Sequence, residues 1–175
     1  NNRSLTNTPI EALLCPSDPT PAVRTDLANW WAYPAANAMG SDRTAGVSCY
    51  KGFAGPDTWD TDPPDALFER QPRRPVLLRD ILDGTSNVLA TGERSPSYSC
   101  WAAWSAANGA WVSTYYRINQ IRETDPVPAA PEVGGVRYGA ISLHMSGINA
   151  GFADGSVHFL HENMDLTIYR QIGHH

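Results

Sequence analysis

The sequence predicts a loop-rich α+β domain in which an antiparallel sheet made of hairpins carries the core and the helices are few and short. Three observations predict this class. Glycine and proline are frequent, with 14 of each in 175 residues. The apolar stretches are short and alternate with polar residues. The turn-forming pairs Asn108-Gly109 and Asp154-Gly155 separate such stretches. The length corresponds to a single domain over residues 1–175, which is enough chain to bury a core.

The elements expected in the first half are short. The apolar run 10–14 ends where two prolines interrupt the backbone in residues 15–19. Residues 47–55 alternate well enough to form a strand. Residues 56–75 then form a long loop rich in proline and aspartate, which is typical of a functional excursion or a surface wrap.

The middle of the chain should contain one helical turn, one strand and one hairpin rich in aromatic residues. Residues 76–82 read as a short helical turn that ends at Asp83-Gly84, and residues 88–91 read as the strand that follows. Residues 100–116 are rich in aromatic side chains, and the Asn108-Gly109 pair predicts a hairpin within them. Another loop rich in proline and glycine covers residues 124–135.

The C-terminal part has the clearest pattern. We expect three strands joined by two turns and followed by a short helix, which Asp165 caps and which runs through Tyr169. The strands are expected over residues 140–144, 149–153 and 156–160. The second turn is Asp154-Gly155, a pair that suits left-handed backbone angles.

Composition excludes some partners. The net charge is -5 with a pI near 5.4, only 18% of residues are charged, and no basic stripe is present. Nucleic acid is therefore not an expected partner. No apolar stretch approaches the roughly 20 residues that span a bilayer. The chain begins with polar residues at Asn1, so we expect that a segment upstream of it was removed.

The three cysteines, Cys15, Cys49 and Cys100, are too widely spaced for a zinc motif. In an exported chain we expect one disulfide bond and one buried thiol. Cys49 and Cys100 are the preferred pair because both flank aromatic segments, and the other pairings remain open. Three buried thiols without a disulfide bond and a reactive thiol are the competing hypotheses.

Two further groups of side chains are candidate binding residues. Asp57, Asp60 and Asp62 could offer oxygen atoms to calcium, although they lack EF-hand spacing, and a solvated acidic loop is the favoured interpretation. Calcium is the only cofactor that the sequence suggests. Flat indole rings could stack on sugars, but filling the core is the favoured role of the six tryptophans. The candidate sugar-binding rings are Trp30, Trp31, Trp59 and Trp104.

No catalytic constellation stands out, and we expect that the chain is not an enzyme. The G-x-S-x-G turn of serine hydrolases is absent. His144 and Asp154 could pair as a base and its orienting group, but hairpin register is expected to separate them. We expect His144 to bind a loop backbone at the end of the sheet. An unrecognised hydrolase would need His144 within hydrogen-bond reach of a nucleophile.

Four segments in order resemble a known family. Residues 14–19 resemble its CPSDP segment, residues 50–55 its Y-x-G-x-x-G segment, and residues 79–93 its DGTSN…GE segment. His144 with residues 152–159 resembles the H-x9-DG box that closes prepilin-like bacterial surface proteins. The residues that carry the resemblance are Asp83, Gly84, Glu93, His144, Asp154 and Gly155.

The resemblance implies an extracellular structural or assembly protein, a subunit similar to a pilin or to a type II secretion pseudopilin. It implies a pilin-like globular head at the cell surface, and other such subunits or the secretion machinery as partners. It also implies that the precursor is anchored in the membrane by an N-terminal helix, which this chain lacks. The alternative is an extracellular module that binds glycans or another ligand through exposed tryptophans and the 56–75 loop.

Overall fold

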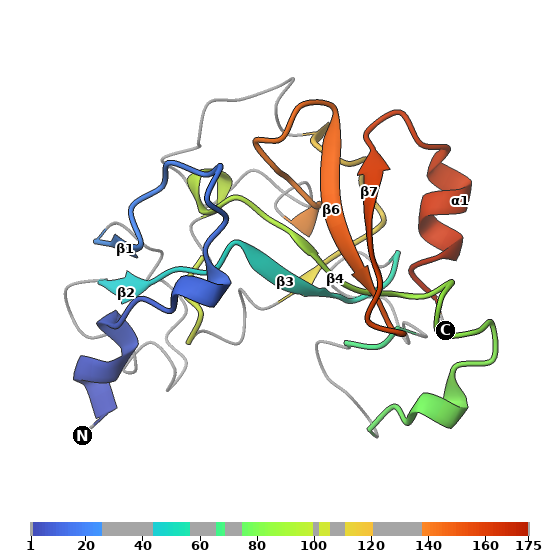
Figure 1. The fold of residues 1–175 in the computed structure, drawn as a ribbon, viewed down its shortest axis with the longest axis horizontal. Coiled ribbons are helices and arrows are strands. Elements are labelled where there is room, and N and C mark those ends of the chain that lie inside the picture. Colours follow the sequence, from blue (N-terminus) through green and yellow to red (C-terminus); the bar gives the residue numbers. More distant parts are fainter. Residues whose placement is uncertain are drawn as a thin grey trace.

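A five-stranded sheet organises the fold (Figure 1). The computed structural model describes residues 2–25, 44–56, 66–68, 75–99, 102–105, 111–120 and 138–174. The sheet has the order β5 (Trp111–Val112), β3 (Tyr50–Phe53), β4 (Leu89–Glu93), β6 (Gly147–Phe152) and β7 (Val157–His161). Neighbouring strands are antiparallel except β5, which runs parallel to β3. A second, two-stranded sheet pairs β1 (Val23–Arg24) with β2 (Ala45–Gly46). The predicted α+β class is therefore confirmed, with a mixed sheet in place of a purely antiparallel one.

The described helices are short, as expected. One is an α-helix, α1 (Leu166–Gln171), and four are 3-10 helices: η1 (Asn2–Asn7), η2 (Glu11–Leu13), η4 (Leu78–Asp80) and η5 (Pro96–Tyr98). Asp165 caps α1, because its side chain accepts hydrogen bonds from the backbone N–H groups of Thr167 and Ile168. Among the described residues, none of these helices has the length and apolar character needed to cross a bilayer.

The β6–β7 hairpin confirms the predicted Asp-Gly turn. Gly155 has a φ of +86°, in the region that glycine adopts without steric cost. The Asp154 carboxylate accepts a hydrogen bond of 2.8 Å from the Ser156 N–H. The turn also docks on the Asp83-Gly84 turn region, because the Asp154 N–H donates to the Thr85 carbonyl at 3.0 Å. Two of the segments that carry the family resemblance are thus in direct contact.

The main core lies between one face of the sheet and α1. Its buried side chains come from all five strands, from α1 and from two irregular segments, and they include Phe53, Leu89, Ile148, Leu160 and Tyr169. Strand alternation places Val157 and Phe159 of β7 on the opposite face from Leu160. Those two side chains are 68% and 50% exposed, so this face of the sheet edge is apolar and open.

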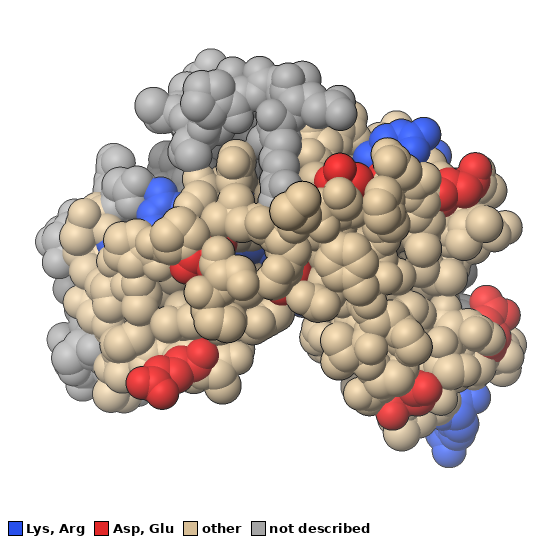
Figure 2. Space-filling view, turned by 45° about the horizontal axis from the view of Figure 1, so that its top comes forward, with Lys and Arg blue, Asp and Glu red and all other residues tan. Residues whose placement is uncertain are grey.

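The described surface is sparsely charged, as the composition predicts. Figure 2 shows one face on which acidic and basic side chains are scattered singly among uncharged ones. No basic patch gathers on the described part of that face.

The strand expected over residues 140–144 does not form. Ile141 makes only an isolated bridge to Arg94. The Ser142 hydroxyl accepts the His144 N–H at 3.1 Å, and this local bond turns the backbone away from a strand ladder. Ser146 then has a φ of +65°, and the chain enters β6 at Gly147. The Asn108-Gly109 hairpin and the 124–135 loop lie outside the described residues.

The sheet leaves no room for a side chain at Gly147. A Cβ atom placed there would lie 2.2 Å from the Leu160 carbonyl oxygen and 2.7 Å from the Phe159 ring. We expect Gly147→Ala to lower the free energy of unfolding by about 3 kcal/mol, because the backbone of the hairpin must move apart. Urea unfolding measures this change. Gly151→Ala in the same strand is the matched control, since its Cβ meets the hydroxyl of the exposed Thr91 side chain. Equal losses in the two variants would contradict the explanation.

Candidate functional site

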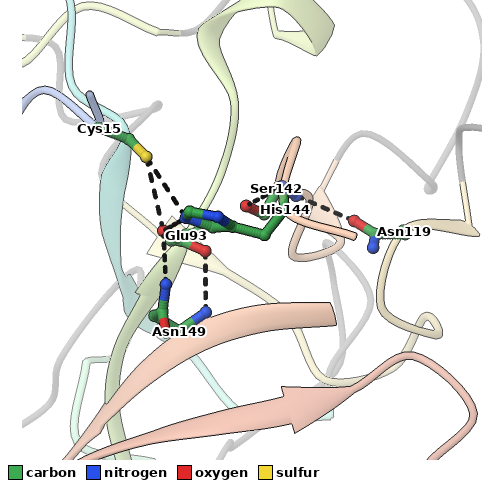
Figure 3. Close-up of polar contacts among 6 residues, drawn as sticks. All are labelled: Cys15, Glu93, Asn119, Ser142, His144 and Asn149. Carbon is green, nitrogen blue, oxygen red and sulfur yellow. Dashed lines mark hydrogen bonds and ion pairs between the residues drawn. The ribbon is translucent and has the colours of Figure 1, made fainter. Parts of the chain in front are cut away.

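Three chemically reactive side chains from distant parts of the chain meet at one point (Figure 3). The Cys15 Sγ atom lies 3.6 Å from His144 Nε2 and 3.8 Å from Glu93 Oε1. His144 Nε2 lies 3.1 Å from the same Glu93 oxygen. The pairs are 129, 78 and 51 residues apart in sequence. We call Cys15, Glu93 and His144 the central cluster.

A different element positions each member of the central cluster. Cys15 follows η2, and the Cys49 N–H donates to the Leu13 carbonyl at 2.7 Å, which ties this segment to the chain before β3. Glu93 is the last residue of β4 and lies opposite Tyr50 of β3. His144 is in the irregular segment that precedes β6. Three separate parts of the chain therefore converge on the sheet face opposite α1.

Further hydrogen bonds hold the carboxylate and the imidazole in place. Glu93 accepts the backbone N–H of Asn149 at 2.8 Å and its side-chain amide at 3.3 Å. Ser142, which accepts the His144 N–H, donates its own backbone N–H to Asn119 Oδ1 at 2.9 Å. Asn119 in turn donates to Glu162 at 2.8 Å. The orientation of the central cluster is thus set by surrounding groups as well as by its own contacts.

The central cluster is buried on one side and open on the other. The Glu93 side chain is 3% exposed, whereas the His144 side chain is 28% exposed. Cys15 is 8% exposed. Burial, followed by the proximity of Cys15 and Glu93, raises the pKa of Tyr50 to about 12. Solvent therefore reaches the cluster from the histidine side, while the neighbouring phenol stays protonated at neutral pH.

The shared histidine nitrogen limits the chemistry. In a nucleophile–histidine–carboxylate triad the imidazole uses one nitrogen for the nucleophile and the other for the carboxylate. Here Nε2 faces both Cys15 and Glu93. This places sulfur, nitrogen and oxygen around a common point, which is how ligands surround an ion.

The structure separates His144 from Asp154, as expected, although residues 140–144 form no strand and the expected hairpin register is therefore not the cause. Asp154 is exposed at the β6–β7 turn and binds Ser156. The His144 imidazole contacts the Glu93 carboxylate, a side-chain partner that the sequence did not predict. The reason is tertiary: the irregular 138–146 segment brings the imidazole to the end of β4. Asp83 and Gly84 have a local role, since Asn87 donates from its side chain to the Asp83 carbonyl at 2.8 Å.

The expected disulfide bond is not supported. Cys49 is a free thiol, as is Cys15. It is buried beside the Cys15 backbone, and burial is the main reason that its pKa is raised to about 11. Cys100 lies outside the described residues.

Most of the other predicted binding residues lie outside the described ranges. These are Asp57, Asp60 and Asp62 of the calcium hypothesis, and Trp30, Trp31 and Trp59 of the sugar hypothesis. Trp104 is half-buried, and its Nε1–H donates to the Thr8 carbonyl at 2.9 Å. Trp111 is buried and stacks on Tyr138 with ring centroids 4.5 Å apart. These two tryptophans pack within the fold, in keeping with the favoured interpretation.

The convergence of the central cluster was not predicted from the sequence. A signal was present, because the CPSDP, GE and H-x9-DG segments each contribute one thiol, carboxylate or imidazole. Side chains of these three types together are typical of metal and nucleophile sites. Spacing alone could not show that they meet.

Lys51, the only lysine, is a second unusual buried group. Its Nζ lies 3.4 Å from the Ala102 carbonyl oxygen, to which it donates. Burial, and then the charge of Arg94, lower the pKa of Lys51 to about 7. In the unfolded chain a lysine pKa is about 10.4. The unfolded state therefore binds more protons between these values, and stability rises with pH across that window.

We expect the free energy of unfolding to increase by roughly 1–2 kcal/mol from pH 7 to pH 8.5 because of Lys51. Above that range the raised pKa of Cys49 acts in the opposite direction. Lys51→Met should remove the increase and be more stable than the wild type at pH 7. Urea unfolding at a series of pH values measures both. An unchanged slope in Lys51→Met would show that another group is responsible.

Fold and site together define a class: a small α+β domain in which the segments that carry the motifs contact one another inside the fold. The chain belongs to the family described as "Protein of unknown function (DUF1559)", SBP_bac_10, whose match spans residues 1–167. No curated protein and no solved structure matches the chain.

Proposed function

We propose that this chain is the globular head of an extracellular structural or assembly protein, a subunit similar to a pilin or a type II secretion pseudopilin. The exposed apolar face of β7 is the observation that carries the proposal. Val157 and Phe159 lie on it, 68% and 50% exposed. β7 is also one of the two edge strands of the five-stranded sheet. Edge strands with exposed apolar side chains are natural places for a neighbouring subunit to bind.

The use of the motif residues supports a structural role. Thr85 of the DGTSN segment accepts a backbone hydrogen bond from Asp154 of the terminal box. The Cys15, Glu93 and His144 side chains contact one another. These contacts stabilise the head itself and leave the β7 face for assembly. In this proposal the chain is exported, displayed at the cell surface, and not an enzyme.

The test compares two single-residue variants in the native full-length protein in its own cells. Electron microscopy with a specific antibody should show filaments or surface assemblies for the wild type. Val157→Asp should abolish them, because a carboxylate cannot be buried unpaired between subunits. Leu5→Asp is the matched control, since Leu5 is 57% exposed on η1, which lies at the opposite end of the molecule from β7 (Figure 1). A wild type that never assembles, or assembly unaffected by Val157→Asp, would overturn the proposal.

The glycan-binding alternative has no observation in its favour among the described residues. Trp104 and Trp111 are the two tryptophans that the described ranges include, and both are engaged in internal contacts.

A further inference from the structure

We propose that the central cluster binds one divalent transition metal ion of the zinc type. Cys15, Glu93 and His144 offer a sulfur, a carboxylate oxygen and an imidazole nitrogen, and these ligand atoms lie within 4.8 Å of one another. Zinc is bound in proteins by these three kinds of atom. A thiolate and an imidazole together select zinc and its neighbours over calcium or magnesium, which prefer oxygen ligands.

The distances fit a tetrahedral ion. Zinc lies about 2.3 Å from sulfur and about 2.0–2.2 Å from nitrogen or oxygen, so tetrahedral ligands are about 3.4–3.6 Å apart. The three observed separations are 3.6 Å for sulfur to nitrogen, 3.8 Å for sulfur to oxygen and 3.1 Å for nitrogen to oxygen. Shifts of a few tenths of an ångström would therefore bring all three atoms to bonding distance from a common centre. The cluster already has the shape of one face of the coordination tetrahedron.

The surrounding groups are those of a supported metal site. Asn149 holds the Glu93 carboxylate through its backbone N–H at 2.8 Å and its side-chain amide at 3.3 Å. Ser142 holds the backbone of His144 at 3.1 Å. Such neighbours fix the direction of the ligands, and their loss typically lowers metal affinity about 10–100-fold.

The burial pattern assigns the fourth position. Glu93 and Cys15 face the interior, and the His144 side chain is 28% exposed. The fourth ligand is then a water molecule or an external donor that arrives from the histidine side. When the ion binds, the Cys15 thiol releases its proton to solvent and becomes a thiolate ligand. The ion would join the N-terminal segment, β4 and the segment before β6.

Cobalt(II) is the probe for the first test, because it replaces zinc and its spectrum reports its ligands. The wild-type protein is stripped with a chelator, kept reduced, and titrated with Co²⁺ alone. We expect a thiolate-to-cobalt charge-transfer band and the visible bands of tetrahedral cobalt, which saturate at one ion per chain. One equivalent of Zn²⁺ should remove both. Absence of these bands, or saturation at another stoichiometry, would overturn the proposal.

Matched variants locate the site. Cys15→Ser should lose the charge-transfer band and His144→Ala should lose the tetrahedral spectrum. Cys49→Ser and His158→Asn should keep both, because Cys49 is a free buried thiol outside the triangle and His158 is exposed on β7. Asn149→Ala should bind Zn²⁺ about 10–100-fold more weakly. A band that survives in Cys15→Ser, or that disappears in Cys49→Ser, contradicts the assignment.

X-ray absorption of the zinc-loaded wild type keeps the test independent of whether the variants fold. We expect one sulfur and three nitrogen or oxygen neighbours around the ion. Two or more sulfur neighbours, or none, would overturn the proposed ligand set. This result does not depend on whether the protein assembles at the cell surface.

Discussion

Glu93→Ala is expected to lower the free energy of unfolding by about 3–5 kcal/mol with metal removed by a chelator. The carboxylate is 3% exposed and accepts from the backbone and side chain of Asn149, besides its contacts with Cys15 and His144. Removing it leaves these groups without their acceptor and opens a cavity at the end of β4. Each buried polar group that loses its partner costs about 1–3 kcal/mol. Urea unfolding measured by circular dichroism gives the change.

Two controls separate the lost contacts from a general effect of losing a carboxylate. Glu11→Ala removes an exposed glutamate of η2 and should change stability by less than about 0.5 kcal/mol. Glu93→Gln keeps the volume and one acceptor oxygen for Asn149, so its loss should be intermediate. A Glu93→Ala loss below about 1 kcal/mol would mean that the central cluster does not join the three segments as the contacts indicate.

Tyr169→Ala is the second large effect, with an expected loss of about 3–5 kcal/mol. Tyr169 is 1% exposed and is among the largest side chains that are fully buried. Its ring meets Phe53 edge-on, with centroids 6.2 Å apart. Removing it would leave a cavity between α1 and the sheet. Thermal and urea unfolding should both report the loss, and a change below about 2 kcal/mol would contradict it.

Tyr169→Phe is the control that separates the ring from the hydroxyl. The hydroxyl has no hydrogen-bond partner among the described residues, and burial raises the pKa of Tyr169 far above its ordinary value. An unpartnered buried hydroxyl is unfavourable, so Tyr169→Phe should be as stable as the wild type or about 1 kcal/mol more stable. A loss above about 1 kcal/mol would show that the hydroxyl binds another part of the chain.

The features that were predicted correctly depend on neighbouring residues. Asp165 caps the helix that follows it because its carboxylate reaches the next N–H groups of the same turn. Asp154-Gly155 turns the chain because glycine adopts a positive φ at little cost. The hairpin strands around that turn follow from alternation and were expected within a few residues of their bounds. In each case the decisive contacts are a few positions apart in the chain.

The features that were missed depend on segments far apart. Residues 140–144 have the composition of a strand, yet the Ser142 hydroxyl accepts a hydrogen bond from the His144 N–H. The segment pairs with the chain after β4 only through the isolated bridge between Ile141 and Arg94. β5 joins β3 in parallel, which needs a long connection that no local pattern specifies. Cys49 was paired with Cys100 on the basis of flanking aromatic residues, whereas its thiol is free and lies beside Cys15.

The sequence by itself determined the α+β class, the terminal hairpin and its Asp-Gly turn, the capped helix, and the residues that carry the family motifs. Only the tertiary structure decided what those residues do together. Cys15, Glu93 and His144 are separated by 129, 78 and 51 residues in pairs, and their side chains meet because β3, β4 and β6 are neighbours in one sheet. The physical reason is the distance along the chain between the groups that interact. Turns and caps form between groups a few bonds apart, whereas a cluster of this kind exists only after the sheet has brought distant segments together.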